Sequence, residues 1–128
     1  MSDVLLVTGG SRGIGAATAI CAAKKGWDVA INYARDAEAA KKVSNEVNAF
    51  GRRSITIKGD MTSEDDILKM FEQVESELGH IKGLVNSAGT TGKTARVENM
   101  TALAIRQILE LNVVGLMLCC REAVKRMS

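Results

Sequence analysis

VLLVTGGSRGIG, residues 4–15, joins a run of apolar side chains to a turn that is rich in glycine. An uninterrupted apolar run is typical of a strand buried on both faces of a parallel sheet, and the alanine-rich residues 13–25 are typical of a helix. Glycines between them allow positive φ angles and let a ligand approach the backbone closely. Unpaired N–H groups in the first turn of a helix suit a pyrophosphate, although a purely structural tight turn would have the same composition.

The glycines follow the spacing G-x-x-x-G-x-G, at Gly9, Gly13 and Gly15. This differs from the common dinucleotide fingerprint G-x-G-x-x-G, and a P-loop is excluded because no Gly-Lys-Ser/Thr follows. The glycine turn alone therefore does not identify the phosphate-containing ligand, and other motifs of the chain are needed.

Strand and helix patterns alternate along the whole chain. Further strands are expected at residues 28–33, 54–60 and 83–89, and further helices at 36–50, after Ser63, and at about 101–127. This alternation predicts an α/β fold with a doubly wound, Rossmann-type parallel sheet in the strand order 3-2-1-4. Ligands in such sheets bind where the strand order reverses, so the turns after the first and fourth strands should face one crevice. No linker interrupts the pattern, and residues 1–128 are expected to form a single domain.

Charge and composition exclude several kinds of protein. The net charge is only +2 and the 17 basic residues are spread among 15 acids, which is unlike a nucleic-acid-binding surface. No basic segment precedes a long apolar one at the start of the chain, which is unlike a secretory signal. The most apolar window, residues 108–120, is too short to span a bilayer. We therefore expect a cytoplasmic protein that binds neither nucleic acid nor a membrane.

The three cysteines indicate neither a disulfide framework nor a metal site, because Cys21, Cys119 and Cys120 lack a C-x-x-C spacing. Cysteine is usually buried, so all three are expected to be small core residues in a reduced compartment. No bound metal is predicted.

Four motifs together resemble the short-chain dehydrogenase/reductase family. TGGSRGIG, residues 8–15, is similar to its T-G-x-x-x-G-x-G motif, and NSAG, residues 86–89, is similar to its N-N-A-G, with Ser87 in place of the second asparagine. GDMTSEDD, which begins at Gly59, resembles the family's segment after the third strand, and Asn112 in LELNVVG falls where the family has a helix asparagine. The motifs occur in the family's order and cover nearly the whole chain.

The resemblance implies a nicotinamide dinucleotide as cofactor and an alcohol or carbonyl compound as substrate. The cofactor's phosphates would lie on a turn formed by Gly9, Ser11, Arg12, Gly13, Ile14 and Gly15. Its adenine would contact Asp60 and Met61, and its ribose and nicotinamide side would contact Asn86, Ala88 and Gly89. The catalytic residue would be Asn112, which would help to hold a water-linked proton relay. From the residues alone, Asn112 could equally satisfy a backbone carbonyl at a helix bend.

The residues after the second strand favour NADP over NAD. A carboxylate about 20 residues beyond the glycines binds the ribose hydroxyls of NAD, but that cofactor-binding position holds Tyr33. Arg12 and Arg35 are expected on either side of the same pocket, and guanidinium groups suit a 2′-phosphate. Asp36 is nearby, but it is expected to cap the second helix.

The family resemblance also implies a general acid in a Tyr-x-x-x-Lys motif that this chain does not contain. The chain's one tyrosine, Tyr33, is followed by alanine at position 37. We therefore expect the chain to be the amino-terminal, cofactor-binding part of an NADP-dependent oxidoreductase, truncated before that motif. The alternative is a complete, non-catalytic dinucleotide-binding or regulatory module. A downstream Tyr-x-x-x-Lys in the reading frame would separate the two.

The last expected helix, residues 101–127, is apolar on more than one side. A surface helix keeps its apolar residues on one stripe, so this helix is expected to pack against its own sheet and against a second subunit. This predicts a homo-oligomer, either a dimer or a tetramer.

Overall fold

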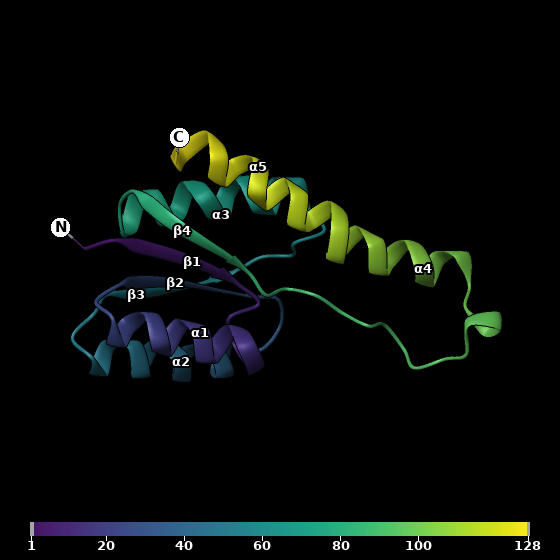
Figure 1. Cartoon of the computed structure of the whole chain (residues 1–128), viewed down its shortest axis with the longest axis horizontal. Coiled ribbons are helices and arrows are strands. Elements are labelled where there is room, and N and C mark those ends of the chain that lie inside the picture. Colours follow the sequence, from purple (N-terminus) through teal and green to yellow (C-terminus); the bar gives the residue numbers. More distant parts are fainter. Residues whose placement is uncertain (1, 128) are drawn as a thin grey trace.

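A computed structural model describes residues 2–127 of the chain and shows a parallel sheet with helices on both faces (Figure 1). The strands are β1 (Val4–Thr8), β2 (Asp28–Tyr33), β3 (Ser54–Lys58) and β4 (Ile81–Asn86). The helices are α1 (Gly13–Lys24), α2 (Ala37–Ala49), α3 (Glu64–Glu77), α4 (Ala102–Leu109) and α5 (Leu116–Met127). The strand order is β3-β2-β1-β4 and every pairing is parallel, which confirms the predicted doubly wound α/β fold.

The strand that carries the glycine turn, β1, is buried along its whole length, as its uninterrupted apolar run predicts. Successive side chains of a strand point to opposite faces of the sheet. Leu6 therefore packs in the core beneath α3 and α5, whereas Val7 packs in the core beneath α1 and α2. The turn after β1 is thus anchored from both faces of the sheet.

Polar side chains cap α2, α3 and α4 at their first turns. The Asp36 carboxylate accepts a hydrogen bond of 3.0 Å from the Ala39 N–H group at the start of α2. Ser63 and Thr101 cap α3 and α4 in the same way. The expected capping of the second helix by Asp36 is therefore confirmed.

The expectation that all three cysteines are buried is wrong. Cys119 lies in the core with its sulfur 3.8 Å from the Met61 sulfur, but Cys21 and Cys120 are exposed. Two successive residues of a helix point in different directions, so Cys119 and Cys120 cannot both face the core. Burial, with Cys120 beside it, raises the pKa of the Cys119 thiol to about 11. That thiol therefore stays protonated at neutral pH.

The last helix is continuous, but its two halves have different surroundings (Figure 1). A π-helical turn, Glu110–Gly115, joins α4 to α5. Helix α5 packs against β4 and α3, whereas none of the α4 residues, all of which are described, is buried. The expectation that the whole helix packs on its own sheet is therefore wrong for its first half, which extends beyond the sheet.

The combined helix Ala102–Met127 is long and apolar enough to cross a membrane by length and composition alone, among the residues that the structure describes. The apolar window identified in the sequence, residues 108–120, is therefore shorter than this apolar helix. Near the end of this run, however, Glu122 is only 2% exposed and is paired with basic side chains. A buried, paired carboxylate is typical of a helix packed in a protein rather than in lipid.

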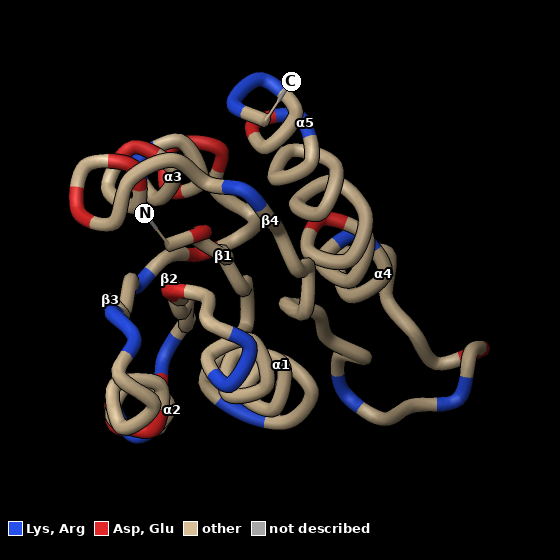
Figure 2. Tube along the Cα trace, turned by 60° about the vertical axis from the view of Figure 1, so that its left-hand side comes forward, with Lys and Arg blue, Asp and Glu red and all other residues tan. Residues whose placement is uncertain are grey.

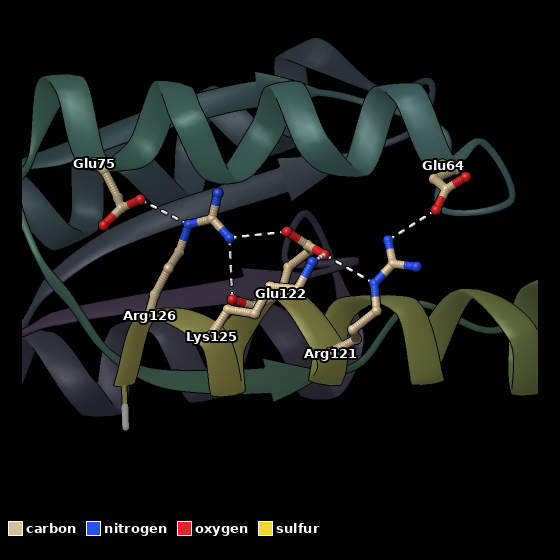
Figure 3. A network of polar contacts seen from close by, with 6 residues as sticks. All are labelled: Glu64, Glu75, Arg121, Glu122, Lys125 and Arg126. Atoms are coloured by element: carbon tan, nitrogen blue, oxygen red, sulfur yellow. Dashed lines mark hydrogen bonds and ion pairs between the residues drawn. The ribbon is translucent and has the colours of Figure 1, made fainter.

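Glu122 is the centre of an ion-pair network that connects α5 to α3 (Figure 3). Its carboxylate accepts hydrogen bonds of 2.8 to 3.2 Å from three basic side chains, Arg121, Lys125 and Arg126. Two of these reach α3, since Arg121 also contacts Glu64 and Arg126 also contacts Glu75. Burial by itself would raise the pKa of Glu122, but the hydrogen bonds from its basic neighbours lower it to about 2.

Candidate functional site

A cavity of about 430 Å³ lies at the carboxyl ends of the strands. All strands of a parallel sheet end at the same edge, so the sheet brings the segments that follow β1, β2, β3 and β4 together there. The residues that line it are Gly9, Ser11, Arg12, Ile14, Asn32, Ala34, Arg35, Asp36, Gly59, Asp60, Met61, Ser87, Ala88, Gly89 and Leu111. Most of the positions expected to bind a cofactor are therefore gathered around one cavity.

The turns after β1 and β4 are in direct contact. Gly9 has a φ of 60°, and a Cβ atom there would lie 2.7 Å from the Ala88 Cα atom. The Thr8 hydroxyl oxygen accepts hydrogen bonds of 3.2 Å from the N–H groups of Ser87 and Ala88. The two turns expected to face one crevice are therefore locked together, and only glycine fits at position 9.

The start of α1 differs from the starts of α2, α3 and α4, because no side chain among the described residues caps it. Arg12 occupies the N-cap position, and the first turn of α1 contains no acidic residue. Gly13 has a φ of 58°, and a Cβ atom there would have no neighbour within 4 Å. Unpaired N–H groups and the positive end of the helix dipole are therefore available to an anion beside the cavity.

Arg12, Arg35 and Asp36 line the cavity next to the end of β2. The Arg12 guanidinium lies 3.4 Å from the Asp36 carboxylate, and the two side chains are 74% and 44% exposed. Such an exposed pair is weak, so another anion could replace Asp36 as the partner of Arg12. The sequence identified both arginines, but it identified Asp36 only as a helix cap.

Tyr33 does not line the cavity. Its ring packs against the core between the sheet and the helices α1 and α2. The last residue of β2 therefore supplies no carboxylate, while Asp36, three residues further on, places one in the cavity lining. Tyr33 itself has no direct contact with the space where a cofactor would lie. A cofactor-binding role for Tyr33 stays a prediction.

The loop after β3 is ordered by its own hydrogen bonds. The Asp60 N–H group donates to the Asp66 carboxylate at 2.8 Å, and the Asp60 carboxylate accepts hydrogen bonds from both the N–H group and the hydroxyl of Thr62. Met61 is 4% exposed and packs against Cys119. Both Asp60 and Met61 line the cavity, and their contact with adenine stays a prediction.

Asn86 and Asn112 lie outside the cavity lining. The Asn86 amide nitrogen donates to the Cys120 sulfur at 3.4 Å. Asn112 lies in the π-helical turn, where its amide oxygen accepts from the Thr90 N–H group at 2.8 Å and its amide nitrogen donates to the Thr90 carbonyl at 2.7 Å. Asn112 thus satisfies a backbone carbonyl at a helix irregularity, which is one of its two expected roles. Its part in a proton relay stays a prediction.

Three lining residues, Asn32, Ala34 and Leu111, were not identified from the sequence. Asn32 is 1% exposed and interrupts the apolar run of β2. A polar side chain in a buried strand must find hydrogen-bond partners, and this signal could have drawn attention to it. Leu111 carries no such signal, because only the path of the last helix brings it to the cavity. Gly13 and Gly15 were expected in the site but lie outside the lining.

The features of the cavity fit a dinucleotide. The uncapped helix start suits a pyrophosphate, and the close approach of Gly9 to Ala88 leaves backbone rather than side chains at that wall. Two exposed arginines supply positive charge at the end of β2. No group of three or more His, Cys, Asp or Glu residues that could hold a metal ion is found within residues 2–127.

Known proteins with similar sequences are oxidoreductases by name. The chain is 42% identical over 125 residues to the uncharacterized oxidoreductase YgfF of Escherichia coli strain K12, a match that covers 98% of this chain and 51% of the relative. It is 33% identical over 127 residues to the 3-oxoacyl-[acyl-carrier-protein] reductase FabG of Staphylococcus epidermidis, covering 99% of this chain and 52% of the relative. The chain thus spans about half the length of these relatives.

The fold and the family model agree with these matches. A short-chain dehydrogenase/reductase from Serratia marcescens superposes with a TM-score of 0.93 at 32% identity, over 98% of this chain and 51% of the other. Residues 3–128 match the family model described as short chain dehydrogenase. The glycine turn, the strand order and this match over nearly the whole sequence show that the chain belongs to the short-chain dehydrogenase/reductase family.

Proposed function

We propose that this chain is the cofactor-binding part of an NADP-dependent oxidoreductase that transfers a hydride between nicotinamide and an alcohol or carbonyl substrate. The observation that carries the proposal is the uncapped start of α1 beside the glycine turn and the cavity. NAD or NADP is the cofactor class of the family. The match to about half of each relative supports one cofactor-binding domain over residues 1–128 within a longer enzyme.

The segments around the cavity would divide the cofactor between them. The glycine turn and the start of α1 would bind the phosphates, the loop after β3 would bind the adenine, and the turn after β4 would face the nicotinamide. The bound cofactor would supply or accept the hydride. The contribution of this chain is to hold it in place and, through Asn112, to fix the backbone of Thr90 beyond β4.

Preference for NADP over NAD is supported by the charges at the end of β2. Tyr33 provides no carboxylate for the ribose hydroxyls, while Arg12 and Arg35 both line the cavity. A 2′-phosphate carries more negative charge than the Asp36 carboxylate, so it would compete well for the exposed Arg12 guanidinium. The relatives named as 3-oxoacyl-[acyl-carrier-protein] reductases support a carbonyl substrate.

Carbonyl reduction also needs a proton donor for the oxygen that gains charge. The chain's single tyrosine, Tyr33, packs against the core away from the cavity. We therefore propose that the general acid comes from a Tyr-x-x-x-Lys segment of the longer enzyme. The alternative of a non-catalytic dinucleotide-binding module gains no support from relatives that are named as an oxidoreductase and reductases.

A homo-oligomer that forms through α4 and the π-helical turn is part of the same proposal. Large apolar side chains are exposed on this part of the helix, namely Leu103, Ile105, Leu109, Val113 and Val114, and apolar patches of this kind mark interaction sites.

Lys and Arg are dispersed over several elements while acids gather on α3 (Figure 2), which supports the absence of a nucleic-acid partner. The buried pairing of Glu122 with Arg126, which in turn pairs with Glu75 on α3, supports a cytoplasmic rather than a membrane protein.

Cofactor binding and turnover test the proposal in the enzyme expressed from its complete reading frame. NADPH and NADH are titrated separately, and NADPH consumption is then followed with a panel of ketones and aldehydes. We expect tighter binding of NADPH and turnover with at least one carbonyl compound. Failure to bind either nucleotide would contradict the proposal, and binding without any turnover would favour the non-catalytic module.

A further inference from the structure

We propose that Asn32 is a positioning residue that sets the affinity for the cofactor by joining the glycine turn to the end of β3. The inference rests on the proposed function, because it concerns the same cavity. Asn32 lies near the end of β2, is 1% exposed and lines the cavity. It is a buried polar side chain at the point where three of the cavity's segments meet.

Asn32 binds two consecutive peptide groups of the glycine turn. Its amide oxygen accepts a hydrogen bond of 3.1 Å from the Gly9 N–H group, and its backbone carbonyl accepts one of 2.8 Å from the Gly10 N–H group. Gly9 is the residue whose φ of 60° brings the turn against Ala88. Asn32 therefore holds the part of the turn from which the phosphate-binding backbone continues.

The other end of the same amide holds the segment after β3. The Asn32 amide nitrogen donates to the carbonyls of Ile57 and Gly59, both at 3.3 Å. Gly59 directly precedes Asp60, which lines the cavity on the proposed adenine side. One side chain thus fixes the separation between the two walls that would hold the phosphates and the adenine.

The amide is matched to these partners by its chemistry. It offers two N–H donors to two carbonyls and one acceptor to one N–H group, so its donors and its acceptor are all used. Aspartate has nearly the same shape and could still accept from Gly9. An ionised carboxylate would, however, place negative charge against the carbonyls of Ile57 and Gly59, and only its protonated form could donate to either of them.

The variant Asn32→Asp should therefore bind the cofactor in a pH-dependent way. The charged groups that face this region are Asp36, Asp60, Arg12 and Arg35 around the cavity and Asp66 behind Gly59. None of them is hydrogen-bonded to Asn32 among the described residues. Burial against carbonyls raises the pKa of a carboxyl, so the variant should keep its affinity at low pH and lose it as the pH rises.

The experiment measures NADPH affinity by nucleotide fluorescence in the enzyme expressed from its complete reading frame. It is done at about pH 6 and about pH 9, because this range brackets the raised pKa expected for the carboxyl group that Asn32→Asp introduces. For Asn32→Asp, we expect the loss of affinity relative to wild type to grow by about tenfold or more between the two pH values. Asn45→Asp places the same change on the exposed face of α2 and should follow wild type at both. Steady-state kinetics should show a raised KM for NADPH with little change in kcat.

A second variant separates positioning from simple loss of fold. Asn32→Ser keeps one hydroxyl in a smaller side chain and should weaken NADPH binding at every pH without pH dependence. Wild-type affinity in both folded variants at about pH 9 would overturn the inference. Loss of folded structure in both variants at every pH would also overturn it, because Asn32 would then support the whole fold rather than the site. If wild type itself binds neither NADPH nor NADH, the proposed function fails first.

Discussion

Asn112 and Thr90 are joined by two hydrogen bonds between one side chain and one residue's backbone. The Asn112 amide accepts from the Thr90 N–H group at 2.8 Å and donates to the Thr90 carbonyl at 2.7 Å. The pair connects the π-helical turn of the last helix to the segment after β4, which continues from the cavity wall. The position of that segment therefore depends on a helix that lies outside the cavity for most of its length.

Asn112→Ala should destabilise the fold and loosen the segment after β4. Two hydrogen bonds to partly exposed groups are lost, so we expect the free energy of unfolding to fall by about 1–2 kcal/mol. Urea unfolding measures this change, and hydrogen exchange at Thr90 should become faster. Asn45→Ala, on the exposed face of α2, is the matched control. Unchanged exchange at Thr90 would show that the pair does not restrain the segment.

Arg12→Ala should weaken NADPH binding much more than NADH binding. A charged hydrogen bond contributes about 1–3 kcal/mol, and only NADP has the additional phosphate that would receive it. Parallel titrations of both nucleotides into wild type and variant measure the difference. Lys25→Ala, just beyond the far end of α1, should change neither affinity. Equal affinities of the wild type for the two nucleotides would refute the proposed preference for NADP.

Gly13→Val should abolish cofactor binding while leaving most of the fold intact. Gly13 has a φ of 58°, which a β-branched residue resists, and the space beside it is where the pyrophosphate would lie. Circular dichroism reports the fold and nucleotide fluorescence reports binding. A variant with an intact spectrum and unchanged affinity would mean that the turn is structural only.

Stability should fall in acid because of Glu122. Its pKa in the folded protein is about 2, below the ordinary value of 4.5, so its ionised form stabilises the fold. This contribution, about 3 kcal/mol at most, is complete above pH 4.5 and is lost as the pH falls toward 2. Urea midpoints across this range test it. Glu122→Gln should be less stable at neutral pH and less sensitive to acid, and an unchanged acid response would contradict the assignment.

Leu109→Lys should dissociate the proposed oligomer. Leu109 is 50% exposed on α4, and a charge there would be buried in an interface between subunits. Sedimentation at micromolar concentration compares wild type, this variant and Val97→Lys. Val97 is 82% exposed in the segment before α4, outside the proposed interface, and its substitution should have no effect. A monomeric wild type would rule out the proposed interface.

The order of the strands and the place of the cavity were predictable from sequence because they depend on local patterns. The apolar run of β1, the glycine turn and the alternation of strands with helices leave few ways to arrange a parallel sheet. The cap at Asp36 was predictable for the same reason, since it bonds to a backbone group three residues away.

Contacts between distant segments could not be predicted in the same way. Positions 119 and 120 hold the same residue type, yet the packing of α5 buries Cys119 and exposes Cys120. Gly115 passes so close to the Met61 carbonyl that a Cβ atom there would lie 2.0 Å from the oxygen, a contact that exists only once the last helix crosses the loop after β3.

The sequence by itself therefore determined the parallel sheet and the glycine turn after β1, because both follow from residues that are neighbours in the chain. The tertiary structure decided that Asn32 joins Gly9 to Gly59, that Asn112 holds Thr90, and that α4 extends beyond the sheet. The physical reason is that a buried hydrogen bond or an exposed apolar face depends on which distant backbone comes within bonding distance. That distance is set by how the helices pack on the sheet.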